Sequence, residues 1–113
     1  MEGSQSQLSP DAATDIRLQN LWYAQNAGKE VAQRYVDAFD DCRRHLEMNP
    51  SIGSACKFRH RRLSGLRKLS FSGRFHVHLA FYRIEGGVID IVRVMHGNRD
   101  LARRLAQPPG TEN

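Results

Sequence analysis

The chain has 113 residues, 40% of them hydrophobic, and a formal net charge of +5 with an isoelectric point near 9.8. This length suits one domain with one core, and the lack of any run of ~18 apolar residues argues against a membrane role. Residues 1–49 hold 5 basic and 8 acidic side chains, whereas residues 50–113 hold 12 basic and 4 acidic ones. The basic second half suggests an anionic partner, either nucleic acid or an acidic protein segment.

The N-terminal residues 1–7 are polar, so they predict either a frayed end or a weak edge strand that reaches Leu8. A typical helix start follows at residues 9–11, because the serine oxygen can cap backbone N–H groups, proline suits the first helical position and aspartate complements the helix dipole. We expect this helix to run to about residue 27 and to stop at Gly28. Its apolar residues form a short stripe that needs burial: Ile16, Leu18, Leu21 and Trp22.

A second helix is predicted up to Asn49-Pro50 by the clearest periodicity in the chain. Apolar residues recur there at spacings of three and four: Val31, Tyr35, Phe39, Cys42 and Leu46. The two helices form a hairpin around Gly28, and a sheet must supply the third layer that buries their stripes.

Two cysteines, Cys42 and Cys56, and the lack of an apolar N-terminal signal segment argue against secretion and against a disulfide framework. We therefore expect a cytoplasmic protein. Cys42 lies on the stripe of the second helix and is expected to be a small core residue, while no neighbour marks Cys56 as a nucleophile.

The region after Pro50 predicts a loop over residues 51–62 and a strand near residues 63–71 that is interrupted at Gly65. Residues 74–83 then alternate. One face, expected in the core, holds Phe75, Val77, Leu79 and Phe81, and a wetter face holds His76, His78, Ala80 and Tyr82. Residues 88–94 are rich in β-branched side chains and should pair antiparallel with this strand across a Glu-Gly-Gly turn.

A last short helix is expected at about residues 99–106, before Pro108-Pro109. The predicted fold class is therefore α+β, with an N-terminal helical hairpin packed on a small antiparallel sheet and a short C-terminal helix. We expect a single domain over residues 1–106 and a disordered tail over residues 107–113.

A basic patch lies within 18 residues that contain no acid: Lys57, Arg59, Arg61, Arg62, Arg67, Lys68 and Arg74. Clustered cations with interleaved aromatic rings can bind nucleic acid. The same residues can instead form a solvated face or dock an acidic protein, and no nucleic-acid-binding motif accompanies them.

The five histidines raise the possibility of a metal or acid–base site. A His-x-His pair at residues 76 and 78 without a third ligand is weak evidence for metal, so we expect no metal and no cofactor. The remaining polar cluster consists of His96, Arg99 and Asp100 after Arg93, and it can either clamp the last strand to the final helix or contact a partner.

Several segments in the same order resemble the ParE branch of the RelE/ParE toxins of bacterial type II toxin–antitoxin modules. They are Leu8-Ser9-Pro10 with Ala13 and Asp15-Ile16, Pro50-Ser51-Ile52-Gly53, Leu66-Arg67, Phe81-Tyr82-Arg83 and, most specifically, Ile91-Val92-Arg93-Val94-Met95-His96-Gly97-Asn98-Arg99-Asp100-Leu101. The resemblance covers roughly residues 7–105. It implies the same α+β fold and a cognate, ParD-like antitoxin whose acidic segment folds across the toxin in a hetero-oligomer.

The resemblance also implies a target. ParE-like members act on DNA gyrase, whereas RelE-like members cut messenger RNA at the ribosome and tend to place a catalytic residue, often tyrosine, near the end of the last strand. No tyrosine follows Tyr82 here, which favours the non-enzymatic gyrase inhibitor. The expected target contacts are Arg93, His96, Arg99 and Asp100. The alternatives are a ribosome-dependent endonuclease that uses histidine and arginine, and a nucleic-acid-binding domain without toxicity.

Overall fold

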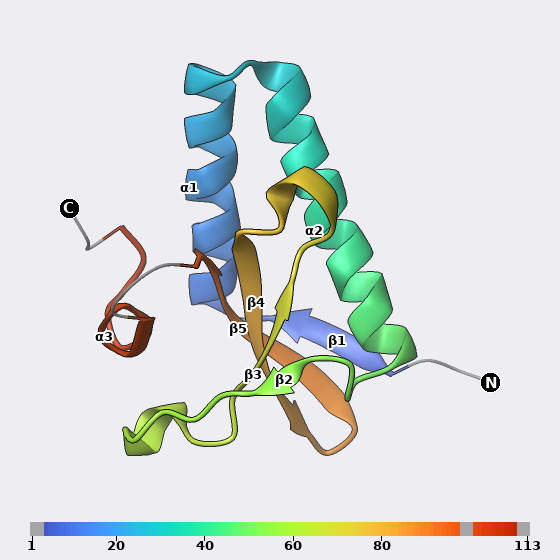
Figure 1. The fold of residues 1–113 in the computed structure, drawn as a ribbon, viewed down its shortest axis with the longest axis vertical. Helices are drawn as coiled ribbons and strands as arrows, with labels where there is room; N and C mark the ends of the chain where they lie inside the picture. The colour runs from blue at the N-terminus through green and yellow to red at the C-terminus, as the bar shows by residue number, and fades with distance from the viewer. Residues whose placement is uncertain (1–3, 98–100, 111–113) are drawn as a thin grey trace.

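The computed structural model describes residues 4–97 and 101–110 and has the predicted α+β architecture (Figure 1). Its elements are β1 (Gln5–Leu8), α1 (Pro10–Asn26), α2 (Lys29–Met48), β2 (Ser54–Ala55), the 3₁₀ turn η1 (Arg61–Leu63), β3 (Arg67–Ser70), the 3₁₀ turn η2 (Gly73–Phe75), β4 (His78–Glu85), β5 (Val88–His96) and α3 (Leu101–Leu105). The strands form one sheet in the order β1-β5-β4-β3-β2. The sheet is mixed rather than purely antiparallel, because β1 runs parallel to β5.

The helical hairpin stands on one face of this sheet, and α2 behaves as its periodicity predicts. Its buried residues are Ala32, Tyr35, Phe39, Cys42 and Leu46. They pack with residues from β4 and β5 in a core cluster that includes Ala80, Tyr82, Ile89 and Ile91. Burial raises the pKa of the Cys42 thiol to about 12, which agrees with a role in packing.

Of the apolar stripe predicted for α1, only Ile16 packs against the core. Leu18, Leu21 and Trp22 are 40%, 51% and 54% exposed. The side of α1 that packs inward instead carries small or polar-tipped residues, such as the fully buried Ala12 and the partly buried Tyr23. Ile16 packs on this inner face as well, whereas the other three apolar residues of the stripe lie on the outer face.

The β4–β5 hairpin is confirmed, including its turn, where Gly86 and Gly87 have φ values of 57° and 78°. Only residues that tolerate positive φ fit both positions of such a two-residue turn. β4 begins later than predicted, at His78, because η2 interrupts the strand. His76 and His78 therefore do not share a strand face, and His76 is exposed.

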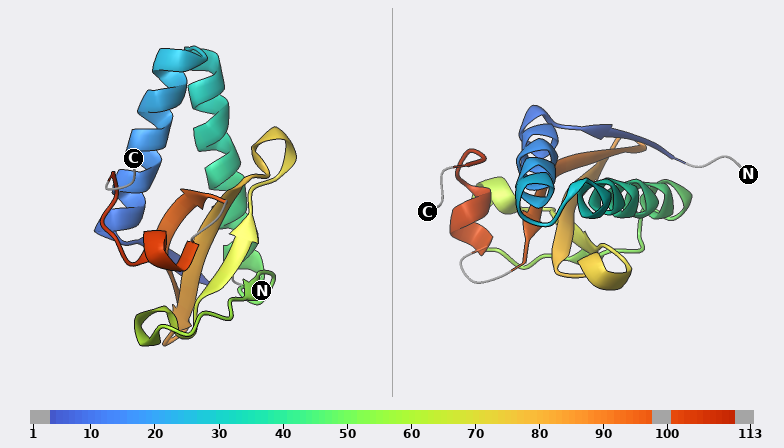
Figure 2. Two further views of the ribbon diagram at one scale, coloured as in Figure 1. Left: turned by 60° about the vertical axis from the view of Figure 1, so that its left-hand side comes forward. Right: turned by 90° about the horizontal axis from the view of Figure 1, so that it is seen from above.

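The face of β4 that we expected to be wetter is buried against the helices: His78, Ala80 and Tyr82 are 1%, 0% and 0% exposed. The opposite face is covered as well, by a smaller cluster that joins Phe81 of β4 and Met95 of β5 to Leu63, Leu66 and Leu105. The loop around η1 and the helix α3 supply this cover, and Figure 2 shows α3 beside β5 and away from α2.

The polar segment β1 does form an edge strand, and contacts from α2 explain how. Arg43 donates from Nε to Ser6 Oγ at 2.7 Å and from Nη2 to the Ser6 carbonyl at 3.1 Å. The backbone N–H of Ser4 donates to the Glu47 carbonyl at 2.7 Å. Polar contacts from α2 thus hold the first part of β1, while Leu8 at its end packs against the core.

The turn after α2 is fixed by the hydroxyl of Tyr82. This hydroxyl donates to the Pro50 carbonyl at 2.8 Å and accepts from the Gly53 N–H at 3.1 Å. A Cβ atom at Gly53 would lie 2.5 Å from both the Lys68 carbonyl oxygen and the Tyr82 hydroxyl, so this position requires glycine.

Candidate functional site

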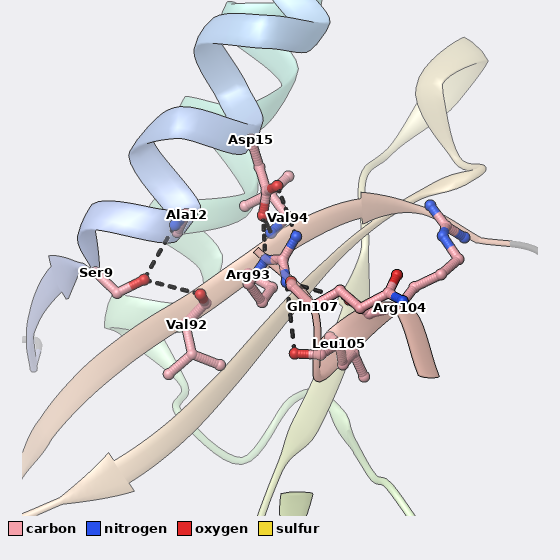
Figure 3. Close-up of polar contacts among 9 residues, drawn as sticks. All are labelled: Ser9, Ala12, Asp15, Val92, Arg93, Val94, Arg104, Leu105 and Gln107. Atoms are coloured by element: carbon pink, nitrogen blue, oxygen red, sulfur yellow. Dashed lines mark hydrogen bonds and ion pairs between the residues drawn. The ribbon is translucent and has the colours of Figure 1, made fainter. Parts of the chain in front are cut away.

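The last strand, β5, extends beyond the end of β1, and side chains rather than a neighbouring strand satisfy its outer edge. Ser9 Oγ, which also caps α1 by accepting from Ala12 N–H at 3.0 Å, donates to the Val92 carbonyl at 2.8 Å. Asp15 accepts from the Val94 N–H at 3.0 Å (Figure 3). Both side chains come from α1, which is therefore joined to β5 by polar contacts.

At this outer edge of β5, Arg93 forms a buried ion pair with Asp15. Its Nε and Nη2 lie 2.7 and 3.0 Å from the two carboxylate oxygens, and the two side chains are only 5% and 9% exposed. Burial raises the pKa of the Asp15 carboxyl, while the hydrogen bonds from Arg93 and Val94 and the charge of Arg93 act in the opposite direction. Removal of either partner of a buried ion pair leaves the other charge buried without compensation, which is strongly destabilising.

The remaining nitrogen of Arg93 binds the C-terminal end of α3. Nη1 donates to the carbonyls of Arg104, Leu105 and Gln107 at 3.3, 3.4 and 2.5 Å (Figure 3). The Arg104 carbonyl also accepts from the Gln107 N–H at 3.1 Å, and a cation is favourable at the C-terminal end of a helix. Arg93 thus connects α1, β5 and α3.

The structure also describes residues 107–110, and the disordered tail over residues 107–113 stays a prediction.

Arg93 thus joins the last strand to the final helix, with Asp15 as its carboxylate partner, and a clamp by Arg99 and Asp100 stays a prediction. Arg99 and Asp100 lie outside the described residues. Sequence reasoning assigned no role to Asp15. No local signal in the sequence marks this pairing, because the two residues are 78 positions apart.

A groove of about 640 Å³ lies between α1, the end of β5 and α3. We call it the α1 groove. α1 contributes Asp15, Leu18, Gln19, Trp22 and Tyr23, β5 contributes Val94, Met95 and His96, and Arg104 and Gly110 complete the lining. Arg104 also donates from Nη1 to the His96 carbonyl at 3.0 Å. Two exposed apolar residues of α1, Leu18 and Trp22, thus share one concave surface with His96, a predicted target contact.

His96 also contacts a buried histidine. Its ring packs edge-on against His78 at 5.3 Å, and His78 Nε2 lies 2.8 Å from the Tyr23 hydroxyl. Burial first, and then the nearby His96, lower the pKa of His78 to about 4, so this imidazole is neutral at physiological pH. Among the residues that the structure describes, no three His, Cys, Asp or Glu side chains are grouped to hold a metal ion.

The structure divides the basic patch. Lys57, Arg59, Arg61 and Arg62 are exposed on the loop around η1. Arg67 on β3 is only partly exposed, and its Nη2 donates to the carbonyls of Ser51 and Gly53 at 3.1 and 2.6 Å. Lys68 is partly buried beside it.

Arg74 lies apart from these residues. Its neighbour Phe75 packs 5.6 Å from the ring of Tyr23, whereas Arg62 lines a small pocket together with Ser9 at the start of α1. Ser9 and Tyr23 are about 20 Å apart along the helix at 1.5 Å per residue. The patch that the sequence suggested is therefore two separate basic regions.

Comparison with solved structures identifies a protein with a similar fold. The fold matches a solved structure titled "Chromosomal ParDE TA system from P. aeruginosa" with a TM-score of 0.69 and 21% identity, over 84% of this chain and 97% of that chain. At this identity the match shows the fold alone.

The family follows from sequence comparison. A family model described as "ParE toxin of type II toxin-antitoxin system, parDE" matches residues 7–101. The chain is also 35% identical over 102 residues to Toxin ParE1 from two strains of Mycobacterium tuberculosis, which covers 87% of this chain and 94% of each relative. The chain belongs to the ParE toxin family of type II toxin–antitoxin systems. No helix among its described residues is long and apolar enough to cross a membrane.

Proposed function

We propose that this toxin inhibits DNA gyrase in the cytoplasm and is neutralised in a hetero-oligomer with its cognate antitoxin. The observation that carries the proposal is the match to the ParE toxin family over residues 7–101, which includes the strand end from Arg93 to Gly97. The resemblance to ParE-like toxins associates this ending with gyrase inhibition.

We propose different roles for the expected target contacts. His96 is exposed at the end of β5 and is a candidate for direct contact with gyrase, together with Arg99 and Asp100. Arg93 is proposed to act indirectly, because its buried guanidinium holds β5 and α3 in place. Substitution of His96 should therefore reduce inhibition without unfolding the protein.

A supercoiling and cleavage assay with purified toxin tests the proposal. Wild-type toxin is expected to block supercoiling and to trap double-strand breaks in plasmid DNA, with His96→Ala less active and the exposed control His76→Ala unchanged. A folded toxin that arrests growth but leaves gyrase unaffected at the same concentration would contradict the proposal.

The second candidate is cleavage of ribosome-bound messenger RNA. The observation in its favour is that Tyr23, His96 and Arg104 line one groove, and such groups can supply acid–base catalysis and charge stabilisation. Against it, Tyr82 is 0% exposed, and its hydroxyl is engaged with Pro50 and Gly53. Intact transcripts and continued translation during toxin expression would exclude it.

A further inference from the structure

We infer that the loop around η1 binds the sugar–phosphate backbone of duplex DNA. This loop, here called the η1 loop, comprises residues 56–66, and its exposed cations are Lys57, Arg59, Arg61 and Arg62. The inference goes beyond the proposed inhibition of gyrase, which requires contact with the enzyme alone. Only the choice of DNA over RNA rests on that proposed function, because gyrase acts on duplex DNA.

The four cations of the η1 loop lie in a part of the chain without negative charge. Residues 48–84 contain no aspartate or glutamate. Among the described residues, no carboxylate forms an ion pair with any of the four cations. Phosphates can therefore bind these side chains without displacing an ion pair within the protein, and the release of counterions from DNA then favours binding.

The backbone of the η1 loop is fixed although its cations are exposed. The Cys56 N–H donates to the Leu66 carbonyl at 2.9 Å, and the Leu66 side chain is buried in the smaller core cluster. Arg83 of β4 donates from Nε to the Ser64 carbonyl at 3.2 Å and from Nη2 to the Arg62 carbonyl. Because these contacts hold the loop in one conformation, less conformational entropy is lost when the cations bind a ligand.

The η1 loop projects from the sheet at the end of the molecule opposite the connection between α1 and α2 (Figure 1). None of its residues lines the α1 groove. The helical hairpin therefore does not block the approach of a rigid, elongated ligand such as a duplex, and a ligand on the loop leaves the α1 groove open.

The side chains of the loop favour a duplex over a single strand or an acidic peptide. Single strands bind largely through stacking of bases on aromatic rings, whereas Phe58 is partly buried against the smaller core cluster. Protein interfaces centre on well-packed anchor side chains, whereas Leu63 and Leu66 are only 6% and 2% exposed. The loop presents a row of cations to solvent, which is what the backbone of a duplex requires.

A matched pair of triple variants of the full-length toxin tests the inference. The loop variant combines Lys57→Gln, Arg59→Gln and Arg61→Gln. The helix variant removes the same residue types from exposed positions of α1 and α2, through Arg17→Gln, Lys29→Gln and Arg34→Gln. Fluorescence anisotropy measures the binding of each protein to a labelled DNA duplex of about 20 base pairs, at salt concentrations from about 50 to about 200 mM.

The dependence of binding on salt is the decisive quantity. For wild type, we expect the logarithm of the binding constant to fall with the logarithm of the salt concentration with a slope of about −3 to −4, as for four neutralised phosphates. The slope should shrink to about −1 in the loop variant and keep its wild-type value in the helix variant. Thermal unfolding provides the folding control, since all six substituted side chains are exposed.

Equal slopes in the two variants, or no binding by wild type at about 50 mM salt, would overturn the inference. Tighter binding of the single strand of the same sequence, of an RNA duplex or of polyglutamate would also overturn it and would assign the loop to that ligand. No gyrase is present in these titrations, so failure of this inference and failure of the gyrase proposal can be distinguished.

Discussion

The two helices of the hairpin differ in what they bury. α2 buries its large apolar residues, such as Tyr35 and Phe39, in the core beneath it. α1 buries Ala12 and the carboxylate of Asp15 and exposes Leu18 and Trp22. The difference indicates that α2 mainly stabilises the fold, whereas α1 combines a polar attachment to β5 with an outer surface suited to a partner.

Truncation of one aromatic residue on each helix is the strongest test of this difference. Phe39→Ala should lower the free energy of unfolding by about 3–5 kcal/mol, because it removes a buried ring and leaves a cavity. Trp22→Ala should change it by no more than about 0.5 kcal/mol, as for an ordinary surface substitution. Chemical denaturation measures both, and a loss at Trp22 close to that at Phe39 would place α1's outer face in the core.

Loss of the polar attachment of α1 to β5 should lower the free energy of unfolding about as much as Phe39→Ala does. Arg93→Met leaves the Asp15 carboxylate buried without its charged partner, so we expect a loss of about 3–5 kcal/mol in unfolding free energy. The control is Arg44→Met on α2, whose ion pair with Asp41 has side chains that are 64% and 52% exposed. Exposed pairs contribute about 0–1 kcal/mol. Equal effects in the two variants would show that the buried pair is not needed.

His78 lies where the two helices meet the sheet, since it contacts Tyr23 of α1 and Tyr35 of α2. Its folded-state pKa of about 4 is below the ordinary value of 6.5, so the unfolded chain binds the proton more readily between these values. The resulting stability is fully present above pH 6.5 and is lost as pH falls towards 4. The total loss of unfolding free energy is about 3 kcal/mol, at about 1.36 kcal/mol for each unit of pKa difference.

Urea denaturation across this pH range measures the effect in wild type, His78→Phe and the exposed control His76→Gln. We expect the unfolding free energy to depend less on pH in His78→Phe, and to depend on pH as in wild type in His76→Gln. A wild-type slope that survives His78→Phe unchanged would assign the pH dependence to other groups.

The turn at the end of α2 should show the smallest of these effects. Tyr82→Phe removes the partner of both the Pro50 carbonyl and the Gly53 N–H. Loss of a buried hydrogen-bonding partner costs about 1–3 kcal/mol. The melting temperature reports this loss, and an unchanged value would mean that the hydroxyl does not fix the turn.

Sequence patterns predicted the parts of the fold that depend on local regularity. The periodicity of α2 and the Gly86-Gly87 turn of the β4–β5 hairpin follow from spacing and backbone preference. The inner face of α1 could not be predicted this way, because apolar residues usually mark the buried side of a helix, whereas Leu18, Leu21 and Trp22 are exposed here.

The candidate site was predicted only in part. His96 was expected near the end of the last strand, whereas the pairing of Arg93 with Asp15 joins residues 78 positions apart. The sequence offers no local signal for such a pair. The burial of His78 was also missed, because the face of β4 that it shares with Ala80 and Tyr82 was expected to be wetter and instead packs against the helices.

The most direct test of the role of α1 uses Trp22, which is the only tryptophan in the chain. Acrylamide quenching of toxin fluorescence is measured for the free toxin and for its complex with the antitoxin, with any antitoxin tryptophan replaced by phenylalanine. We expect strong quenching of the free toxin, since Trp22 is 54% exposed, and clear protection in the complex. Equal quenching in both states would contradict the assignment of this surface to the partner.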